Sequence, residues 1–117
     1  MKTSPTQRSL KLLRDRGYIC GISEKWIPAS PAGFKGPIVR SDLWGFADIC
    51  AVKIGVPGTT YVQTTSGSNV SARVEKIKGL AAAGIVKASG NKIVVHGWRT
   101  VGERGKRKLW ECREVEV

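Results

Sequence analysis

The sequence predicts an α/β (α+β) fold, with one compact domain over residues 1–117 and a central mixed β-sheet of about four or five strands flanked by two main helices. The length of 117 residues suits one domain. Hydrophobic residues make up 41% and charged residues 25%, as in ordinary globular proteins. Two segments with helical apolar spacing are interspersed among β-branched runs, and this pattern indicates a mixture of helices and strands.

The first element is a helix predicted over residues 5–16. Ser4 supplies an N-cap, Pro5 occupies the first helical position, and Gln7 completes a capping box. Leucines supply an apolar side, and Gly17 is a typical C-terminal stop.

The segment that follows combines a strand with a long connection. Residues 18–22 read as a strand, and residues 24–27 either continue it or begin a loop. Residues 28–39 hold three prolines and two glycines, which predicts an irregular connection. Lys35 and Arg40 make this segment basic. With its aromatic residues it either contacts nucleic acid by charge and stacking or is an ordinary loop pinned by those aromatics.

The middle of the chain predicts a hairpin followed by a helix. Residues 49–52 form an apolar run typical of a buried strand, and residues 60–65 are β-branched and aromatic, as expected of its partner. Apolar residues then recur at helical spacing, which predicts a helix over residues 69–83 that extends at most to residue 88. Strands over 92–98 and 108–117 complete the order helix, strand, loop, strand, strand, helix, strand, strand.

The chain is strongly basic, with 20 Lys plus Arg against 9 Asp plus Glu and a net charge of +11. Residues 1–99 carry 15 of the basic and 5 of the acidic side chains, so the excess belongs to the folded body rather than to a tail. Such a charge favours a nucleic-acid partner. A ribosomal role, a membrane-surface role and a merely solvated basic surface are the alternatives.

Several classes of protein are excluded by composition. No apolar run approaches the ~20 residues of a transmembrane helix, and no secretory leader is recognisable, so no membrane partner is expected. Three scattered cysteines and one histidine do not match a structural zinc site, and they suit a reducing cytoplasm. Phosphate-loop and dinucleotide fingerprints are absent, which argues against ATP- or NAD-dependent chemistry.

Two acidic residues stand out because carboxylates are scarce. Asp42 and Asp48 bracket residues 43–47, and Asp48 directly precedes the apolar strand 49–52. A carboxylate there is costly to desolvate unless something pairs with it. A divalent cation such as Mg²⁺, a nearby Lys or Arg, or a turn cap would each serve.

This arrangement resembles the PD-(D/E)XK nuclease superfamily, in which a helix, a three-stranded meander, a helix and a further strand form the core. In that family an Asp opens the second core strand, as Asp48 does here. The next strand carries an acidic residue and a Lys two positions apart. Gln63 and Thr65 stand at these positions, and Mrr-like members also use Gln at the first of them.

The resemblance implies a restriction endonuclease-like fold and metal-dependent endonuclease activity on DNA, with Mg²⁺ or Mn²⁺ as cofactor. It implies catalytic roles for Asp48, Gln63, Asp42 and Thr65, and the first three would also be metal ligands. Small, basic members similar to Holliday-junction resolvases act on branched DNA, are commonly homodimers, and are often encoded by phages or mobile elements. The expected location is therefore the cytoplasm, either at the nucleoid or in a phage-infected host cell.

Further residues are assigned to nucleic-acid contacts. The basic side chains expected to contact DNA or RNA are Lys25, Lys35, Arg40, Lys53, Arg73, Lys76 and Arg99. Among them Lys25, Lys53 or Lys76 would replace the missing motif lysine. His96 and Trp98 are accessory candidates at a strand end, with purely structural roles as the alternative.

Two other functions compete with the nuclease. A non-catalytic DNA- or RNA-binding module on the same fold is favoured by Gln63 and Thr65, because both depart from the motif. A basic protein-interaction regulator, such as a phage-encoded regulator of a host machine, is the third hypothesis.

Overall fold

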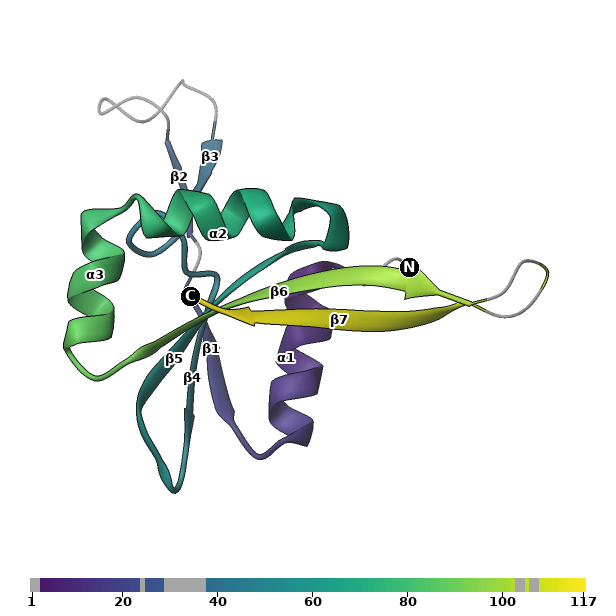
Figure 1. Cartoon of the computed structure of the whole chain (residues 1–117), viewed down its shortest axis with the longest axis horizontal. Helices are drawn as coiled ribbons and strands as arrows, with labels where there is room; N and C mark the ends of the chain where they lie inside the picture. Colours follow the sequence, from purple (N-terminus) through teal and green to yellow (C-terminus); the bar gives the residue numbers. More distant parts are fainter. Residues whose placement is uncertain (1–2, 24, 29–37, 103–104, 106–107) are drawn as a thin grey trace.

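A five-stranded mixed sheet with helices on both faces forms the centre of the molecule, shown by a computed structural model (Figure 1). The structure describes residues 3–23, 25–28, 38–102, 105 and 108–117. The elements in chain order are α1 (Pro5–Asp15), β1 (Ile19–Ile22), β2 (Lys25–Pro28), β3 (Ile38–Ser41), β4 (Ile49–Lys53), β5 (Val56–Ser66), α2 (Val70–Lys78), α3 (Ala81–Ala88), β6 (Lys92–Val101) and β7 (Leu109–Glu116). The predicted α+β class with a mixed sheet is confirmed.

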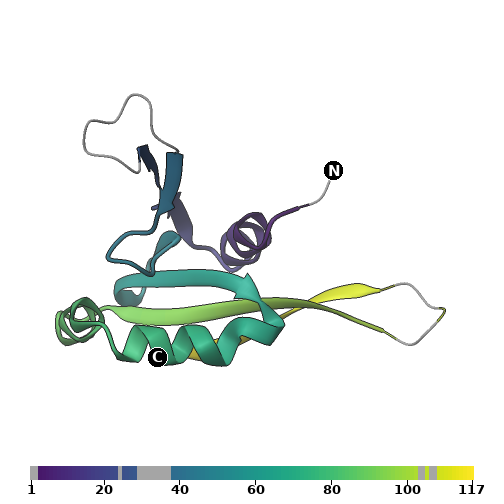
Figure 2. The same cartoon turned by 90° about the horizontal axis from the view of Figure 1, so that it is seen from above.

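The strand order in the sheet is β1-β4-β5-β6-β7. β1, β4 and β5 form an antiparallel meander. β5 and β6 are parallel, because α2 and α3 carry the chain back across one face between them. β7 returns antiparallel to β6. Figure 2 shows α1 on one face of the sheet and α2 on the other.

The helix α1 begins where its capping residues predict. The Ser4 side chain accepts a hydrogen bond from the backbone N–H of Gln7 at 3.2 Å, and Pro5 opens the first turn. Leu10 and Leu13 are buried against the sheet residues Ile49, Ala51 and Val62. Burying each such side chain stabilises the fold by about 1.5–3 kcal/mol, so α1 is firmly docked.

The opposite face is covered by two helices where the sequence predicts one. α2 ends at Gly79, and Leu80 takes the extended backbone conformation that starts α3. Glycine is a poor helix former, and the break lets Ala83 and Val86 turn toward the sheet. The prediction of a continuous helix over residues 69–83 is therefore wrong at residues 79–80, and the sheet is flanked by three helices rather than two.

The connection after β1 is more ordered than predicted at its ends. β2 and β3 pair as a separate two-stranded antiparallel sheet, with Lys25 opposite Ser41 and Pro28 opposite Ile38. The rest of the predicted irregular connection, residues 29–37, lies outside the described residues, as does Glu24.

The last two strands form a long hairpin that extends past α1 (Figure 1). β6 runs to Val101, beyond the predicted end at residue 98. In the described part of the chain, no helix has the length and apolarity that a membrane span requires.

Candidate functional site

A polar pocket lies between the first turn of α1 and the last residues of β5. Its volume is about 420 Å³. It is lined by Ser4, Pro5, Thr6, Asp42, Gln63, Thr64, Thr65 and Arg73. Four of these residues, Asp42, Gln63, Thr65 and Arg73, were predicted as site residues from the sequence. We call this site the polar pocket.

Asp48 is not among the described residues that line the polar pocket; the way β4 begins fixes it beside Thr64, which does line the pocket. The β4–β5 pairing reaches Ile49 and Val62, and the Asp48 backbone N–H still donates to the Val62 carbonyl at 2.9 Å. The Asp48 carboxylate then accepts hydrogen bonds from the Thr64 backbone N–H at 2.8 Å and from the Thr64 hydroxyl at 3.2 Å. Asp48 is fully buried, and these bonds fix its carboxylate beside the strand that carries Gln63.

Asp42 reaches the same region through a tight turn. Leu43 and Ala47 form an isolated antiparallel bridge, so Asp42 and Asp48 flank the two ends of one closed loop. At the tip, Trp44 has a φ of 56°, and its ring packs edge-on against Tyr61 with centroids 4.8 Å apart. The bridge therefore brings the backbone at Asp42 near the backbone at Asp48, although the two residues are six apart in the sequence.

Gln63 contributes a buried side-chain oxygen that lacks a hydrogen-bond partner. The side chain is only 2% exposed. Among the described residues, its Oε1 is the one buried side-chain oxygen or nitrogen without a hydrogen-bond partner. A buried carbonyl oxygen without a partner costs about 1–3 kcal/mol, so a cation or donor that enters the pocket would relieve that cost.

Hydroxyl groups and one cation complete the wall. The Thr6 and Thr64 hydroxyls lie 2.9 Å apart and join α1 to β5. Thr65, which stands where the motif lysine is expected, is 7% exposed and lines the pocket. Arg73 on α2 is the one cationic side chain among the described residues of the lining. The pocket therefore combines carboxylate, amide and hydroxyl oxygens with a single guanidinium.

The candidate ligand atoms are chemically suited to a hard divalent cation. Asp42, Asp48 and Gln63 offer only oxygen atoms, which Mg²⁺ and Mn²⁺ prefer. Gln63 lines the pocket, and its buried Oε1 has no hydrogen-bond partner among the described residues. Among the described residues, no three His, Cys, Asp or Glu side chains form a metal-binding group, so the site depends on the amide.

Three other predicted contact residues, Lys53, Lys76 and Arg99, are not in the lining of the polar pocket. Lys53 is at the far end of β4 from Asp48, with its ammonium 5.6 Å from the centroid of the Tyr18 ring. Lys76 is exposed on α2. Arg99 pairs with Glu111 at 2.9 Å. For the remaining three, the backbone places Lys25 on β2 and Arg40 on β3, and Lys35 lies outside the described residues.

The two accessory candidates, His96 and Trp98, are joined through a buried serine. The Trp98 Nε1–H donates to the Ser9 hydroxyl at 2.8 Å, and His96 Nδ1 lies 2.9 Å from the same oxygen. An indole nitrogen can only donate, so Ser9 accepts from Trp98; Ser9 donates to His96 in the tautomer whose Nε2 carries the hydrogen. His96 Nε2 faces Glu114 at 3.2 Å, and Arg16 holds Glu114 with two bonds at 2.6 and 2.9 Å.

Burial lowers the pKa of His96 below its ordinary value of 6.5, although the Glu114 carboxylate acts in the opposite direction. The hydrogen bond from Arg16 lowers the pKa of Glu114. A neutral imidazole that accepts from Ser9 and donates to Glu114 satisfies all of these groups. His96 and Ser9 are 1% and 0% exposed, and neither lines the polar pocket. This geometry supports a structural role for His96.

Sequence reasoning missed Ser9 and Thr64. Ser9 falls on the inward stripe of α1 between Thr6 and Leu10, and a polar residue on a buried helix stripe signals a specific partner. Thr64 lies between the two motif positions, and no pattern in the sequence marked it. Its role depends on where the pairing of β4 with β5 ends, which the sequence does not reveal.

Comparisons with protein-family models, with curated proteins and with solved structures found no match for this chain.

Proposed function

We propose that this protein binds DNA and hydrolyses its phosphodiester bonds in the polar pocket with the help of Mg²⁺ or Mn²⁺. The observation that carries the proposal is the buried, unpartnered Oε1 of Gln63 in a pocket that also contains Asp42 and Arg73. The net charge of +11 supports a polyanionic substrate.

The order of helices and strands also supports the proposed nuclease function. α1, the β1–β4–β5 meander, the helical crossover and the parallel strand β6 follow the core of the PD-(D/E)XK superfamily, which the sequence resembles. Asp48 immediately precedes the second strand of the meander, and Gln63 lies on the third. We therefore propose a restriction endonuclease-like fold whose motif positions are Asp48, Gln63 and Thr65.

Five residues in or beside the polar pocket have a role in this proposal. The Asp42 and Asp48 carboxylates and the Gln63 carbonyl would hold the cation, and Thr64 orients Asp48 through its backbone N–H. When bound, the cation polarises a phosphoryl oxygen and lowers the pKa of a coordinated water. The Arg73 guanidinium neutralises charge that develops on the phosphate, a task that suits its fixed fork of donors.

A cleavage assay tests the proposal. Labelled linear and branched DNA is incubated with the protein and Mg²⁺ or Mn²⁺, with and without a chelator. We expect cleavage that the chelator stops and that Asp42→Asn abolishes. Glu75→Gln is the matched control, because Glu75 is exposed on α2 and does not line the polar pocket. Cleavage that survives the chelator or Asp42→Asn would contradict the proposal.

A non-catalytic nucleic-acid-binding module is the second candidate, and Thr65 favours it. A threonine cannot supply the positive charge that a lysine gives at this position. Thr65→Lys separates the two candidates. If the wild type binds DNA with a steep salt dependence but does not cleave, and Thr65→Lys cleaves, the chain is a binding module on a nuclease fold.

A further inference from the structure

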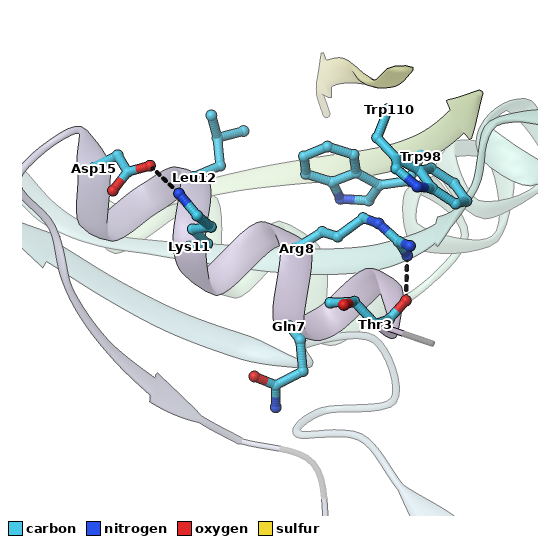
Figure 3. Close-up of a pocket in the computed structure, with 8 residues that line it drawn as sticks. All are labelled: Thr3, Gln7, Arg8, Lys11, Leu12, Asp15, Trp98 and Trp110. Carbon is cyan, nitrogen blue, oxygen red and sulfur yellow. Dashed lines mark hydrogen bonds and ion pairs between the residues drawn. The ribbon is translucent and has the colours of Figure 1, made fainter. Parts of the chain in front are cut away.

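A second pocket lies between α1 and the β6–β7 hairpin, and we call it the aromatic pocket. Its volume is about 430 Å³, within the range of small-ligand sites. Figure 3 shows Trp98 and Trp110 side by side on one wall, with Arg8, Gln7 and Lys11 projecting from α1. The proposed chemistry at the polar pocket uses none of these side chains.

Arg8 and Trp110 form a flat cationic platform. The guanidinium carbon of Arg8 lies 3.5 Å from the centroid of the Trp110 ring, and the guanidinium also donates to the Thr3 carbonyl (Figure 3). Trp110 is 50% exposed although it is a large apolar side chain. An exposed indole stacked on a guanidinium is a surface on which a further planar group can stack.

Trp98 forms a fixed part of the wall. Its indole N–H donates to Ser9 at 2.8 Å, and Ser9 is fully buried in α1. The ring is therefore held in place before any ligand arrives, which reduces the conformational entropy lost on binding.

Charge and polarity at the pocket favour a ligand with a planar base and an anionic backbone. Arg8 and Lys11 contribute two positive charges, and Asp15, which pairs with Lys11 at 3.1 Å, contributes one negative charge. Gln7 also lines the pocket, and Figure 3 shows its amide directed away from the two tryptophans. A nucleobase offers a planar face to stack on the aromatic ring, and the phosphate of its nucleotide carries the complementary charge.

The two pockets lie on either side of the first turn of α1. Ser4, Pro5 and Thr6 line the polar pocket, whereas Thr3, Gln7 and Arg8 line the aromatic pocket. A nucleic-acid strand that places a phosphate in the polar pocket therefore reaches the aromatic pocket by crossing the N-terminal turn of α1.

We propose that the aromatic pocket binds a nucleobase of single-stranded DNA, stacked on the Arg8–Trp110 platform. A base inside a duplex is already stacked and paired. The base that binds in the aromatic pocket therefore comes from an unpaired region of the DNA. This inference rests on the proposed function as far as DNA is the substrate, and it adds a preference for single-stranded or locally opened DNA.

Fluorescence anisotropy with a labelled oligothymidylate, an abasic oligonucleotide of equal length and a blunt duplex tests the inference. A stacked base contributes about 1–3 kcal/mol, so Trp110→Ala should weaken oligothymidylate binding by about fivefold or more. Binding of the abasic strand and the duplex should change by less than about twofold. Arg8→Lys keeps the positive charge but lacks the planar guanidinium. It should therefore weaken binding of oligothymidylate more than binding of the abasic strand or the duplex.

Leu109→Ala is the matched control, because Leu109 is exposed next to Trp110 on β7 and does not line the pocket. Trp110→Phe keeps an aromatic ring and should retain part of the affinity. If Trp110→Ala weakens the abasic strand as much as oligothymidylate, or weakens neither, the inference is wrong while DNA binding stands. If the wild type binds no DNA at all, the proposed function itself fails.

Discussion

Ser9→Ala removes one oxygen atom from the interior and leaves two neighbours without their partner. The Ser9 hydroxyl lies 2.9 Å from His96 Nδ1 and accepts from Trp98 Nε1 at 2.8 Å. Ser9 and His96 are 0% and 1% exposed, so water does not reach the vacated position at the imidazole. The variant changes almost no volume, and the effect therefore reports on the hydrogen bonds rather than on packing.

The expected loss follows from the two orphaned groups. A buried donor or acceptor that loses its partner costs about 1–3 kcal/mol. Two such groups, less about 0.5 kcal/mol because alanine is the better helix former, give a loss of about 1.5–5.5 kcal/mol. This is a large share of the roughly 5–15 kcal/mol that stabilises a typical domain, and it should lower the melting temperature by about 10 °C.

Urea unfolding followed by circular dichroism measures this loss, with Ser71→Ala as the matched control. Ser71 is exposed on α2, so its replacement should change the free energy of unfolding by less than about 0.5 kcal/mol. A loss in Ser9→Ala no greater than in Ser71→Ala would refute the view that Ser9 joins His96 to Trp98.

Three further predictions concern stability and reactivity. Because burial lowers the pKa of His96, the unfolded chain binds a proton that the folded chain does not, so the free energy of unfolding should decrease as pH falls through about 6.5. Gly97→Ala places a Cβ 2.1 Å from a methyl carbon of Val70 and should cost about 1–3 kcal/mol in urea unfolding. Burial, aided by Glu114, raises the pKa of the Cys112 thiol to about 12, so iodoacetamide should label Cys112 far more slowly in folded than in unfolded protein.

Each of these predictions has an internal control. The chain contains a single histidine, so His96→Gln should flatten the pH dependence of stability between about pH 5.5 and 7.5. At Gly21 a Cβ would meet nothing within 4 Å, so Gly21→Ala should leave stability within about 0.5 kcal/mol. Equal labelling rates for Cys112 in folded and unfolded protein, a flat pH profile in the wild type, or equal effects of the two glycine variants would contradict the respective predictions.

Local signals predicted most of the fold. The Ser4 cap and Pro5 placed the start of α1 because capping depends only on neighbouring residues. The apolar spacing of residues 70–81 predicted the inward face of α2 but not its end. The break at Gly79 and Leu80 depends on how α3 packs against the sheet, and spacing along one helix does not encode that contact. The β2–β3 pairing was missed because breakers dominate that stretch.

The sequence indicated candidate site residues that lie on or near a strand. It did not indicate contacts between residues that are far apart in the chain. Asp42, Gln63 and Thr65 line one pocket, whereas Asp48, the first motif position, is buried and hydrogen-bonded to Thr64. Arg73 was predicted as a contact residue, and the structure brings it to that pocket instead of a lysine. The link from Ser9 to His96 spans 87 positions, and no local pattern could have indicated it.

Binding of Mn²⁺, followed by electron paramagnetic resonance, tests most directly the central claim that the polar pocket holds a divalent cation. Gln63→Leu removes the amide oxygen and should weaken Mn²⁺ binding by about tenfold or more, whereas Gln63→Glu supplies a carboxylate and should strengthen it. Gln7→Leu, at the exposed glutamine of α1, should leave Mn²⁺ binding unchanged. The claim would be contradicted if the wild type bound no Mn²⁺, or if Gln63→Leu bound Mn²⁺ as tightly as the wild type.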